Sequence, residues 1–339
     1  MMKEALFYTS HDRGVRCLLC PKGCLIDDGK RGDCRVRLNN KGILYTLNYG
    51  KVTALSYDPI EKKPLYHFLP GSYIFSIGTF GCNFSCPFCQ NWEISQATEV
   101  DIPSKDISLE DLILYGKKYG SVGVAFTYNE PTIWYEFIRD SAPLIKQNGL
   151  KVVLVTNGYI NPLPQRELLP YVDAMNIDLK AFSDEFYVKY TGGHLLPVLR
   201  AIEQAHDRGI HVEITNLIIT GLNDSKEDIS ALVDWVYQLD PKIPLHFSRY
   251  FPAYKMNRPP TSLATIEMAY NMARERLYYV YMGNVLNPEG NTTYCKNCGK
   301  PIIERRGYEI TSYNIDGDRC KFCGERVDGV FEVNRDLEE

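Results

Sequence analysis

Short apolar segments alternate with helix-like segments from about residue 72 to residue 283, and this alternation constrains the fold more than any other feature of the 339-residue chain. The apolar segments are rich in β-branched and aromatic residues, which is typical of strands. Strand–helix alternation over roughly 200 residues predicts right-handed βαβ units and a parallel sheet. About six such units fit an α/β fold with a partial (β/α)6 TIM-like barrel better than a closed eight-unit barrel.

The predicted strands and helices follow this period along the chain. The strands are expected at 73–79, 122–127, 151–156, 174–179, 211–218, 244–248 and 278–282. The helices are expected at 109–119, 132–147, 197–208, 227–238 and 263–276. Ser108 and Ser225 each precede an acidic first turn and are therefore predicted N-caps. Parallel barrels carry their chemistry at the carboxyl ends of their strands, so site residues are expected there.

A cysteine triplet with the spacing CxxxCxxC follows the first predicted strand, at Cys82, Cys86 and Cys89. Three thiolates on one short loop can hold three irons of a 4Fe–4S cube, which normally takes four protein ligands. The next cysteine along the chain is Cys295, so one iron is left open to an exchangeable molecule. A zinc loop, or three unrelated buried thiols, is the alternative interpretation.

The other eight of the eleven cysteines form two sets of four. One set makes two CxxC pairs separated by twenty-one residues, which is typical of a zinc-ribbon or rubredoxin-like structural site: Cys295, Cys298, Cys320 and Cys323. Zinc is the expected metal, and iron is the alternative because four thiolates also suit iron. The second set is expected to bind zinc or an auxiliary Fe–S cluster: Cys17, Cys20, Cys24 and Cys34.

Composition divides the chain into three parts and limits its partners. A Cys-rich N-terminal segment (1–71), a core (72–284) and a four-cysteine tail (285–339) are expected. A net charge of −4 excludes a global basic field for nucleic acid. Local basic charge leaves nucleic-acid binding by the tail open; it comes from Lys296, Lys300, Arg305, Arg306, Arg319 and Lys321.

The expected location is the cytoplasm. No apolar stretch approaches 18 residues and the first ten residues have no hydrophobic signal region, so neither a membrane span nor a signal peptide is expected. Eleven cysteines without a secretion signal predict metal ligation in a reducing compartment.

The triplet, in its place after a strand, resembles the signature of the radical S-adenosylmethionine (SAM) enzymes. The resemblance implies a SAM-bound 4Fe–4S cluster that cleaves SAM reductively, producing a 5′-deoxyadenosyl radical that abstracts hydrogen from a substrate. It also implies a flavodoxin- or ferredoxin-like electron donor. The sequence does not identify the substrate, and it leaves open whether SAM is consumed or regenerated.

Six residues at predicted strand ends are candidate SAM contacts. Asn129 and Glu130 match the position of the family's Gly-Gly-Glu-Pro motif, with Tyr128 and Asn129 in place of the two glycines, and an ordinary helix start is the alternative. Asp178 and Lys180 share one face of a strand and resemble an Asp-x-Lys element of glycyl-radical activases; a solvent-side ion pair is the alternative.

The fifth strand supplies the remaining two candidates. Thr215 and Asn216 would suit the ribose hydroxyls, unless they are only a β-favouring Thr and a turn-forming Asn. His246 is expected to be structural more readily than a contact to adenine or substrate, and Trp92 is expected to pack over the cluster loop.

A narrower resemblance covers nearly the whole chain, from about Cys17 through the four-cysteine tail. Residues 58–71 (DPIEKKPLYHFLPG) and 81–95 (GCNFSCPFCQNWEIS) are similar to the radical SAM proteins of the AmmeMemoRadiSam system, which are related to pyruvate formate-lyase activating enzyme. This resemblance implies functional association with the two other proteins of that system. The first alternative function is a glycyl-radical activase acting on a partner protein, and the second is a non-catalytic metal-binding or electron-transfer module.

Overall fold

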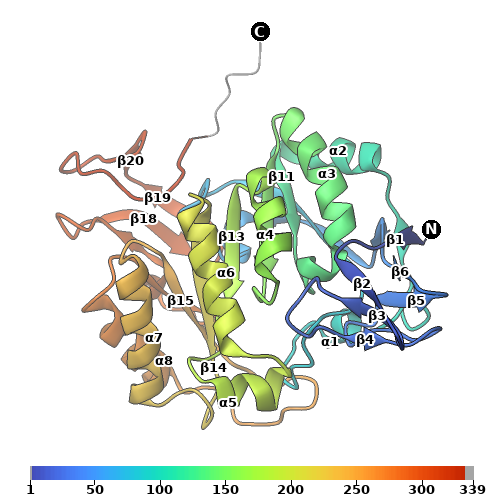
Figure 1. The fold of residues 1–339 in the computed structure, drawn as a ribbon. Coiled ribbons are helices and arrows are strands. Elements are labelled where there is room, and N and C mark those ends of the chain that lie inside the picture. The colour runs from blue at the N-terminus through green and yellow to red at the C-terminus, as the bar shows by residue number, and fades with distance from the viewer. Residues whose placement is uncertain (1, 333–339) are drawn as a thin grey trace.

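An eight-stranded mixed sheet forms the centre of the computed structural model, which describes residues 2–332 (Figure 1). Its strand order is β16-β15-β14-β13-β12-β11-β9-β8, and all neighbours are parallel except β8 and β9. The strands are β8 (Ala54–Pro59), β9 (Tyr73–Gly78), β11 (Ser121–Phe126), β12 (Lys151–Thr156), β13 (Ala174–Asp178), β14 (His211–Ile218), β15 (Leu245–Arg249) and β16 (Val280–Gly283).

All seven predicted strands are present in this sheet, and together they make seven parallel strands, one more than the six-unit expectation. The sheet is mixed because β8, which lies within residues 1–71, pairs antiparallel with β9. The partial barrel itself stays a prediction. Because the seven strands are parallel, their carboxyl ends lie along one edge, where the cysteine triplet follows β9.

Five helices connect the strands at or near the predicted positions: α2 (Leu109–Gly116), α3 (Tyr135–Gln147), α6 (Leu195–Asp207), α7 (Lys226–Leu239) and α8 (Leu263–Arg274). The predicted N-caps are confirmed, since Ser108 and Ser225 accept hydrogen bonds from the backbones of Asp111 and Asp228. The predicted helix 132–147 begins instead as the 3-10 turn η3 (Pro131–Trp134), because Pro131 starts the turn and Glu130 caps it.

Several short helical segments are absent from the sequence predictions. The structure adds α4 (Pro162–Leu168), in which Pro162 occupies the first turn, where proline is favourable. The others are η1 (Ile60–Lys62), α1 (Trp92–Ser95), η2 (Lys118–Gly120), η4 (Leu169–Tyr171), α5 (Asp184–Phe186), the π-helical η5 (Tyr187–Thr191) and α9 (Pro288–Asn291). No helix in the described residues is both long enough and apolar enough to cross a membrane.

The N-terminal segment forms small sheets beside α3, on the opposite side of the molecule from the C-terminal strands (Figure 1). One sheet contains β1 (Lys3–Glu4), β6 (Ile43–Thr46) and β5 (Arg37–Asn40), and a second contains β2 (Tyr8–His11), β3 (Gly14–Cys17) and β4 (Leu25–Ile26). In addition, β7 (Lys51–Val52) pairs antiparallel with β10 (Lys105–Asp106) in a separate two-stranded sheet.

The segment that follows β8 packs against polar side chains of the central strands. Glu213 on β14 accepts hydrogen bonds from the backbone N–H groups of Tyr66 (3.0 Å) and His67 (2.7 Å). Asn176 on β13 donates to the carbonyl of Pro64 at 2.7 Å. These contacts satisfy the backbone of a buried, irregular segment, which would otherwise lose its hydrogen bonds to water without replacement.

The C-terminal tail adds β17 (Thr293–Tyr294), β18 (Pro301–Arg306), β19 (Glu309–Tyr313), β20 (Ile315–Asp316) and β21 (Arg319–Cys320). The tail packs on the segment after β8, because buried Arg305 donates to the carbonyl of Tyr66 at 2.8 Å. The backbone of Val330 also exchanges hydrogen bonds with His67 and Leu69. Residues 333–339 of the expected tail lie outside the described residues.

Candidate functional site

The loop after β9 carries the cysteine triplet, and its sulfur atoms have few polar neighbours. The backbone N–H of Phe84 lies 3.4 Å from the Sγ of Cys82, and the Oγ of Ser95 lies 3.3 Å from the Sγ of Cys89. Burial raises the pKa of the Cys82 thiol well above its usual range and that of Cys86 to about 12. A metal that binds here must therefore displace thiol protons.

The donor set of the triplet fits three irons of a cube. In the described part of the chain, one set of four cysteines in the tail is the only group of metal-ligating side chains whose ligand atoms all lie within 4.8 Å of one another. The Sγ atoms of Cys82, Cys86 and Cys89 therefore do not all lie within 4.8 Å of one another, which is compatible with ligands of separate irons. Each would bind one iron, which leaves the fourth without a protein ligand.

Asp178 and Lys180 lie beside the triplet at the carboxyl end of β13. The Nζ of Lys180 donates to Oδ2 of Asp178 at 2.7 Å. Burial lowers the pKa of Lys180, but the negative charges of Asp178 and Cys86 outweigh burial and raise it above its usual range. β13 ends at Asp178, so Lys180 lies beyond the strand on which the sequence placed it, and the two side chains form an ion pair there. The pair thus places one positive and one negative charge beside the thiols. These charges could bind the carboxylate and the ammonium group of an amino acid.

Glu130 makes several contacts to the protein itself. Its Oε1 accepts from the backbone N–H of Thr132 (2.8 Å) and the hydroxyl of Thr156 (2.7 Å), and its Oε2 accepts from the backbone N–H of Asn157 (2.8 Å). Burial raises its pKa. Glu130 thus ties the end of β11 to the end of β12 and caps η3. Its predicted contact with SAM stays a prediction.

Asn129 connects the same strand end to the triplet loop. Its Oδ1 accepts from the backbone N–H of Thr79 at 3.1 Å, and its Nδ2 donates to the carbonyl of Gly81 at 2.8 Å. The side chain of Asn129 therefore fixes the backbone of the two residues, Thr79 and Gly81, that lead into the triplet loop. The neighbouring Tyr128 has a left-handed backbone (φ 71°) where the resembling motif has a glycine.

Thr215 and Asn216 both support the backbone and side chains of β13. The hydroxyl of Thr215 donates to Oδ1 of Asn176 at 3.0 Å. The Nδ2 of Asn216 donates to the carbonyl of Leu179 at 2.8 Å and lies 3.3 Å from that of Lys180. These contacts position the Asp178–Lys180 element, and the predicted ribose contacts stay predictions.

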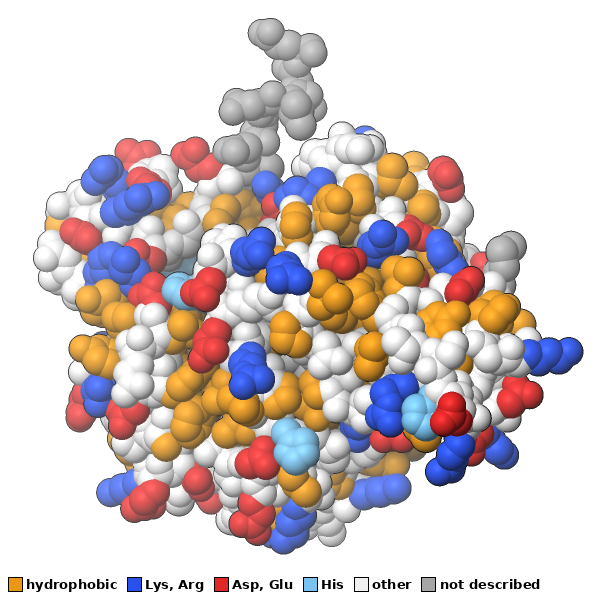
Figure 2. Space-filling view, viewed as in Figure 1, with side chains coloured by type: hydrophobic (Ala, Val, Ile, Leu, Met, Phe, Trp, Pro, Cys, Tyr) orange, Lys and Arg blue, Asp and Glu red, His pale blue; other side chains and the backbone are white. Residues whose placement is uncertain are grey.

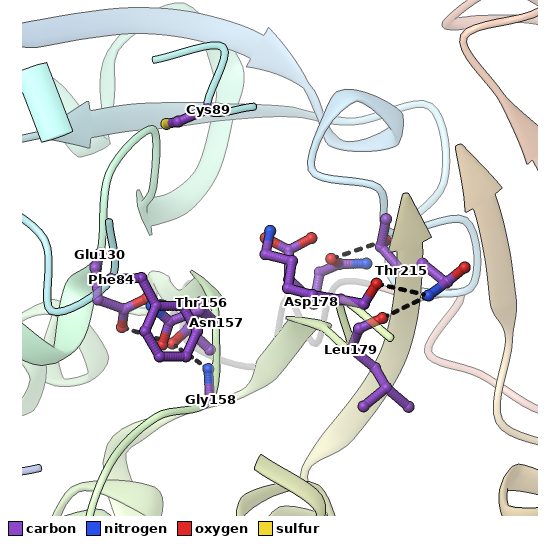
Figure 3. A network of polar contacts seen from close by, with 12 residues as sticks. Phe84, Cys89, Glu130, Thr156, Asn157, Gly158, Asp178, Leu179 and Thr215 are labelled. Atoms are coloured by element: carbon purple, nitrogen blue, oxygen red, sulfur yellow. Dashed lines mark hydrogen bonds and ion pairs between the residues drawn. The ribbon is translucent and has the colours of Figure 1, made fainter. Parts of the chain in front are cut away.

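Figure 3 shows how these groups are arranged. Glu130, Thr156, Asn157 and Gly158 lie on one side, Asp178, Leu179 and Thr215 on the other, and Cys89 lies above them. The strand ends thus bring candidates from β11, β13 and β14 to the region of the triplet, as the parallel topology predicts.

His246 makes structural contacts, whereas the predicted packing of Trp92 over the cluster loop stays a prediction. His246 is buried, its Nε2 lies 2.6 Å from Oε2 of Glu213, and its ring stacks on Tyr281. Trp92 stacks on Tyr254, with ring centroids 5.0 Å apart.

Two asparagines near the triplet were not identified as site residues. Asn157 donates to Oδ1 of Asn83 at 2.8 Å, and its Nδ2 lies 3.9 Å from the Sγ of Cys82. Their positions, at the end of a strand and inside the cysteine motif, are the sequence signals that could have indicated them.

The four cysteines of the tail form a compact group that can hold one metal ion. The Sγ of Cys295 lies 3.6 Å from that of Cys323, and the Sγ of Cys298 lies 3.9 Å from that of Cys320. A hydrogen bond from the backbone N–H of Glu325 lowers the pKa of Cys323 to about 6. Four thiolates leave no open position on a tetrahedral ion, so the site is suited to a structural role.

Nucleic-acid binding by the tail stays a prediction, since four of its six basic residues are exposed: Lys300, Arg306, Arg319 and Lys321. The other two make ionic contacts within the protein. Arg305 is buried, with Glu61 beside it, and Lys296 pairs with Asp328 at 2.7 Å. On the face that Figure 2 shows, Lys and Arg side chains are interspersed with Asp and Glu. That face presents no single-sign field for a polyanion.

Known proteins are similar in sequence to the core and to the whole chain. The profile of the Radical SAM superfamily matches residues 76–236. The chain is 45% identical to an uncharacterized protein of Methanocaldococcus jannaschii over 336 residues, which cover 97% of this chain and 100% of that protein. It is 26% identical to a pyruvate formate-lyase-activating enzyme of Staphylococcus epidermidis over 177 residues, 48% of this chain and 68% of that enzyme.

Among solved structures, SuiB of Streptococcus suis aligns with a TM-score of 0.49 and 16% sequence identity. The alignment covers 66% of this chain and 52% of SuiB.

Proposed function

The chain belongs to the radical SAM superfamily, and from this premise we propose that it cleaves SAM reductively and uses the product radical on a substrate of its own. The observation that carries the proposal is the position of Lys180. Its ammonium group interacts electrostatically with both Cys86 and Cys89 and pairs with Asp178. A cation and a carboxylate beside an incompletely ligated cluster suit the amino acid group of SAM.

The triplet would hold three irons, with Asp178 and Lys180 around the fourth. When bound, the cluster supplies the electron that breaks the sulfonium C5′–S bond of SAM, giving methionine and a 5′-deoxyadenosyl radical that takes a hydrogen atom from the substrate. Lys180 would bind the carboxylate of SAM and Asp178 its ammonium group. Asn129 and Glu130 would complete the ammonium site, and Thr215 and Asn216 would face the ribose.

The remaining components follow from the cysteine chemistry and the resemblance. We infer a partial barrel around the site, a structural zinc in the tail and a reducing, cytoplasmic environment. A flavodoxin- or ferredoxin-like protein would supply the electron. The other two proteins of the AmmeMemoRadiSam system are the proposed functional partners.

A second candidate function is supported by the similarity to pyruvate formate-lyase-activating enzymes over 48% of the chain. In that case the substrate would be a backbone glycine of a partner protein, and the product a protein-bound glycyl radical. Mixing the reduced, SAM-loaded enzyme with a candidate partner would then give a radical signal that persists on the partner.

The test of the proposed function is made without oxygen. The protein is reconstituted with iron and sulfide, reduced with dithionite and supplied with SAM, and 5′-deoxyadenosine is quantified by liquid chromatography. The Cys86→Ala variant is the control, because it removes one iron ligand. Production that disappears in Cys86→Ala supports the proposal.

The contrary outcome is also specific. If the reconstituted protein keeps its cluster but binds no SAM, the proposal that it is an enzyme is overturned. A metal-binding or electron-transfer module would then remain.

A further inference from the structure

The four N-terminal cysteines line one cavity. Cys17 ends β3, Cys20 and Cys24 lie in the connection to β4, and Cys34 lies before β5. The fold of the segment holds the connection closed, since the backbone N–H of Cys17 donates to the carbonyl of Cys24 at 2.9 Å. All four side chains lie on the wall of the same cavity. They therefore form one site rather than two pairs.

The spacing of sulfur atoms distinguishes a single ion from a cluster. A metal with bonds of about 2.3 Å to four thiolates brings neighbouring sulfurs to about 3.8 Å in a tetrahedron. The tail shows this spacing, with Sγ pairs at 3.6 and 3.9 Å for Cys295–Cys323 and Cys298–Cys320. All four sulfurs of the tail lie within 4.8 Å of one another.

The N-terminal cysteines do not have this compact spacing. In residues 2–332, no group of three or more metal-ligating side chains apart from the tail set has all its ligand atoms within 4.8 Å. The same is true of Cys82, Cys86 and Cys89, whose chemistry is that of a cube. The N-terminal set therefore differs from the tail set in the spacing that a single tetrahedral ion requires.

Arg37 provides a second, independent observation at this cavity. Its side chain is 1% exposed and lines the cavity, and both of its terminal nitrogens bind Glu136. Its Nε has no hydrogen-bond partner. An unpaired buried N–H is costly unless a ligand accepts from it. The sulfides and thiolates of an Fe–S cluster are acceptors of this kind, and such hydrogen bonds tune cluster potentials.

The cavity adjoins the loop that carries the triplet. Asn83, which follows Cys82 directly, lines the cavity. A Cβ atom added to Gly81 would lie 2.5 Å from the carbonyl oxygen of Cys34, so the two segments are in close contact. Arg35 also donates to the carbonyl of Cys82 at 3.4 Å.

We propose that Cys17, Cys20, Cys24 and Cys34 bind a second 4Fe–4S cluster, adjacent to the triplet loop. With four cysteine ligands this cluster has no open iron, so it does not bind SAM. Zinc, the first expectation from the sequence, requires the compact spacing that this site lacks.

The test uses the full chain with the triplet disabled, as the variant Cys82→Ser/Cys86→Ser/Cys89→Ser. The protein is purified and reconstituted anaerobically with ferrous iron and sulfide, and iron, zinc and acid-labile sulfide are measured. Sulfide decides the question, because a mononuclear site binds none. The expected result is about half of the wild-type sulfide, with iron in equal amount, since one of two clusters remains. Zinc or iron without sulfide, or an empty site, would overturn the proposal.

The matched control adds Cys20→Ser/Cys24→Ser to the triplet variant. This protein should lose the remaining sulfide and keep the metal of the tail, with an unchanged far-ultraviolet circular dichroism spectrum.

A second measurement on the wild-type protein does not depend on the folding of a variant. After reduction with dithionite, SAM should shift only part of the electron paramagnetic resonance signal of the clusters. A signal that shifts completely with SAM would contradict a second cluster.

Discussion

Arg37 and Glu136 form a buried, two-pronged ion pair between the N-terminal segment and α3. Nη1 lies 2.8 Å from Oε1, and Nη2 lies 2.9 Å from Oε2. The backbone N–H of Leu6 also donates to Oε1 at 2.8 Å. The wall of the N-terminal cysteine cavity is thus attached to a helix of the central fold.

Removing only one partner of this pair should destabilise the protein strongly. The Glu136→Leu variant leaves the Arg37 charge buried without compensation, which costs about 3–5 kcal/mol. Urea denaturation of the anaerobic protein measures the free energy of unfolding. The double variant Arg37→Met/Glu136→Leu should recover part of this loss, and a double variant less stable than Glu136→Leu would contradict the explanation.

Replacing Lys180 should weaken SAM binding without removing the cluster. A charge-assisted hydrogen bond contributes about 1.5–3 kcal/mol, so Lys180→Met should raise the Kd for SAM by roughly tenfold or more. Anaerobic isothermal titration calorimetry measures the affinity, and iron content verifies the cluster. Lys226→Met, on the exposed first turn of α7, is the matched control. An unchanged Kd in Lys180→Met would exclude the assigned role.

Gly81→Ala should disturb the contact between the two cysteine segments. Gly81 has φ +87°, and an added Cβ would lie 2.5 Å from the carbonyl oxygen of Cys34 and 2.8 Å from Val36. Gly209→Ala is a matched control, because Gly209 has φ +72° but no atom within 4 Å of the added Cβ. Both variants bear the left-handed strain, and overpacking adds about 1–3 kcal/mol at Gly81 alone. Equal melting temperatures and equal iron contents would rule out this close contact.

The stability of the protein should fall as the pH decreases from about 6.5 to about 4. Burial lowers the pKa of His67 to about 4, below the unfolded value near 6.5. In this window the unfolded chain binds a proton that the folded chain excludes, so stability falls by up to about 1.4 kcal/mol per pH unit as the pH drops. Denaturation of wild type and His67→Gln over this range isolates the effect. If the free energy of unfolding changes with pH equally in both proteins, groups other than His67 cause the pH dependence.

Removing the metal of the tail should loosen the tail. The site needs all four thiolates, and structural metal sites of this type contribute several kcal/mol or more to folding. Treatment with a chelator, or the Cys298→Ser variant, should therefore expose residues 293–332 to limited proteolysis. The same tail packs Arg305 against Tyr66, so the melting temperature of the whole chain should also fall. Full protease resistance after chelation would contradict a structural metal.

The periodic features of this fold can be predicted from the sequence because they are local. The apolar segments at 73–79 and 151–156 become β9 and β12. Ser108 caps α2, and Ser225 caps α7. Asp178 and Lys180 are two residues apart and form an ion pair, although β13 ends at Asp178 and Lys180 lies beyond it. These properties depend on residues close together in the chain.

Contacts between strand ends cannot be predicted in this way. Glu130 carries the sequence signal of a SAM contact, yet its oxygens accept from Thr156 and Asn157, which become neighbours only when β11 and β12 pair. Asn157 and Asn83 likewise meet across 74 residues. Arg305 in the tail is buried and donates to the carbonyl of Tyr66, which lies 239 residues away.

The sequence by itself determined the order of strands and helices, the three groups of cysteines and the family, because each depends on residue type and spacing along the chain. Tertiary structure alone decided how far apart the sulfur atoms of each group lie. Four cysteines can ligate one ion or four irons with similar spacing in sequence, and the distance between sulfurs is set by how the segments pack. The compact spacing of the tail cysteines, which the N-terminal cysteines lack in the described residues, is therefore evident only after folding.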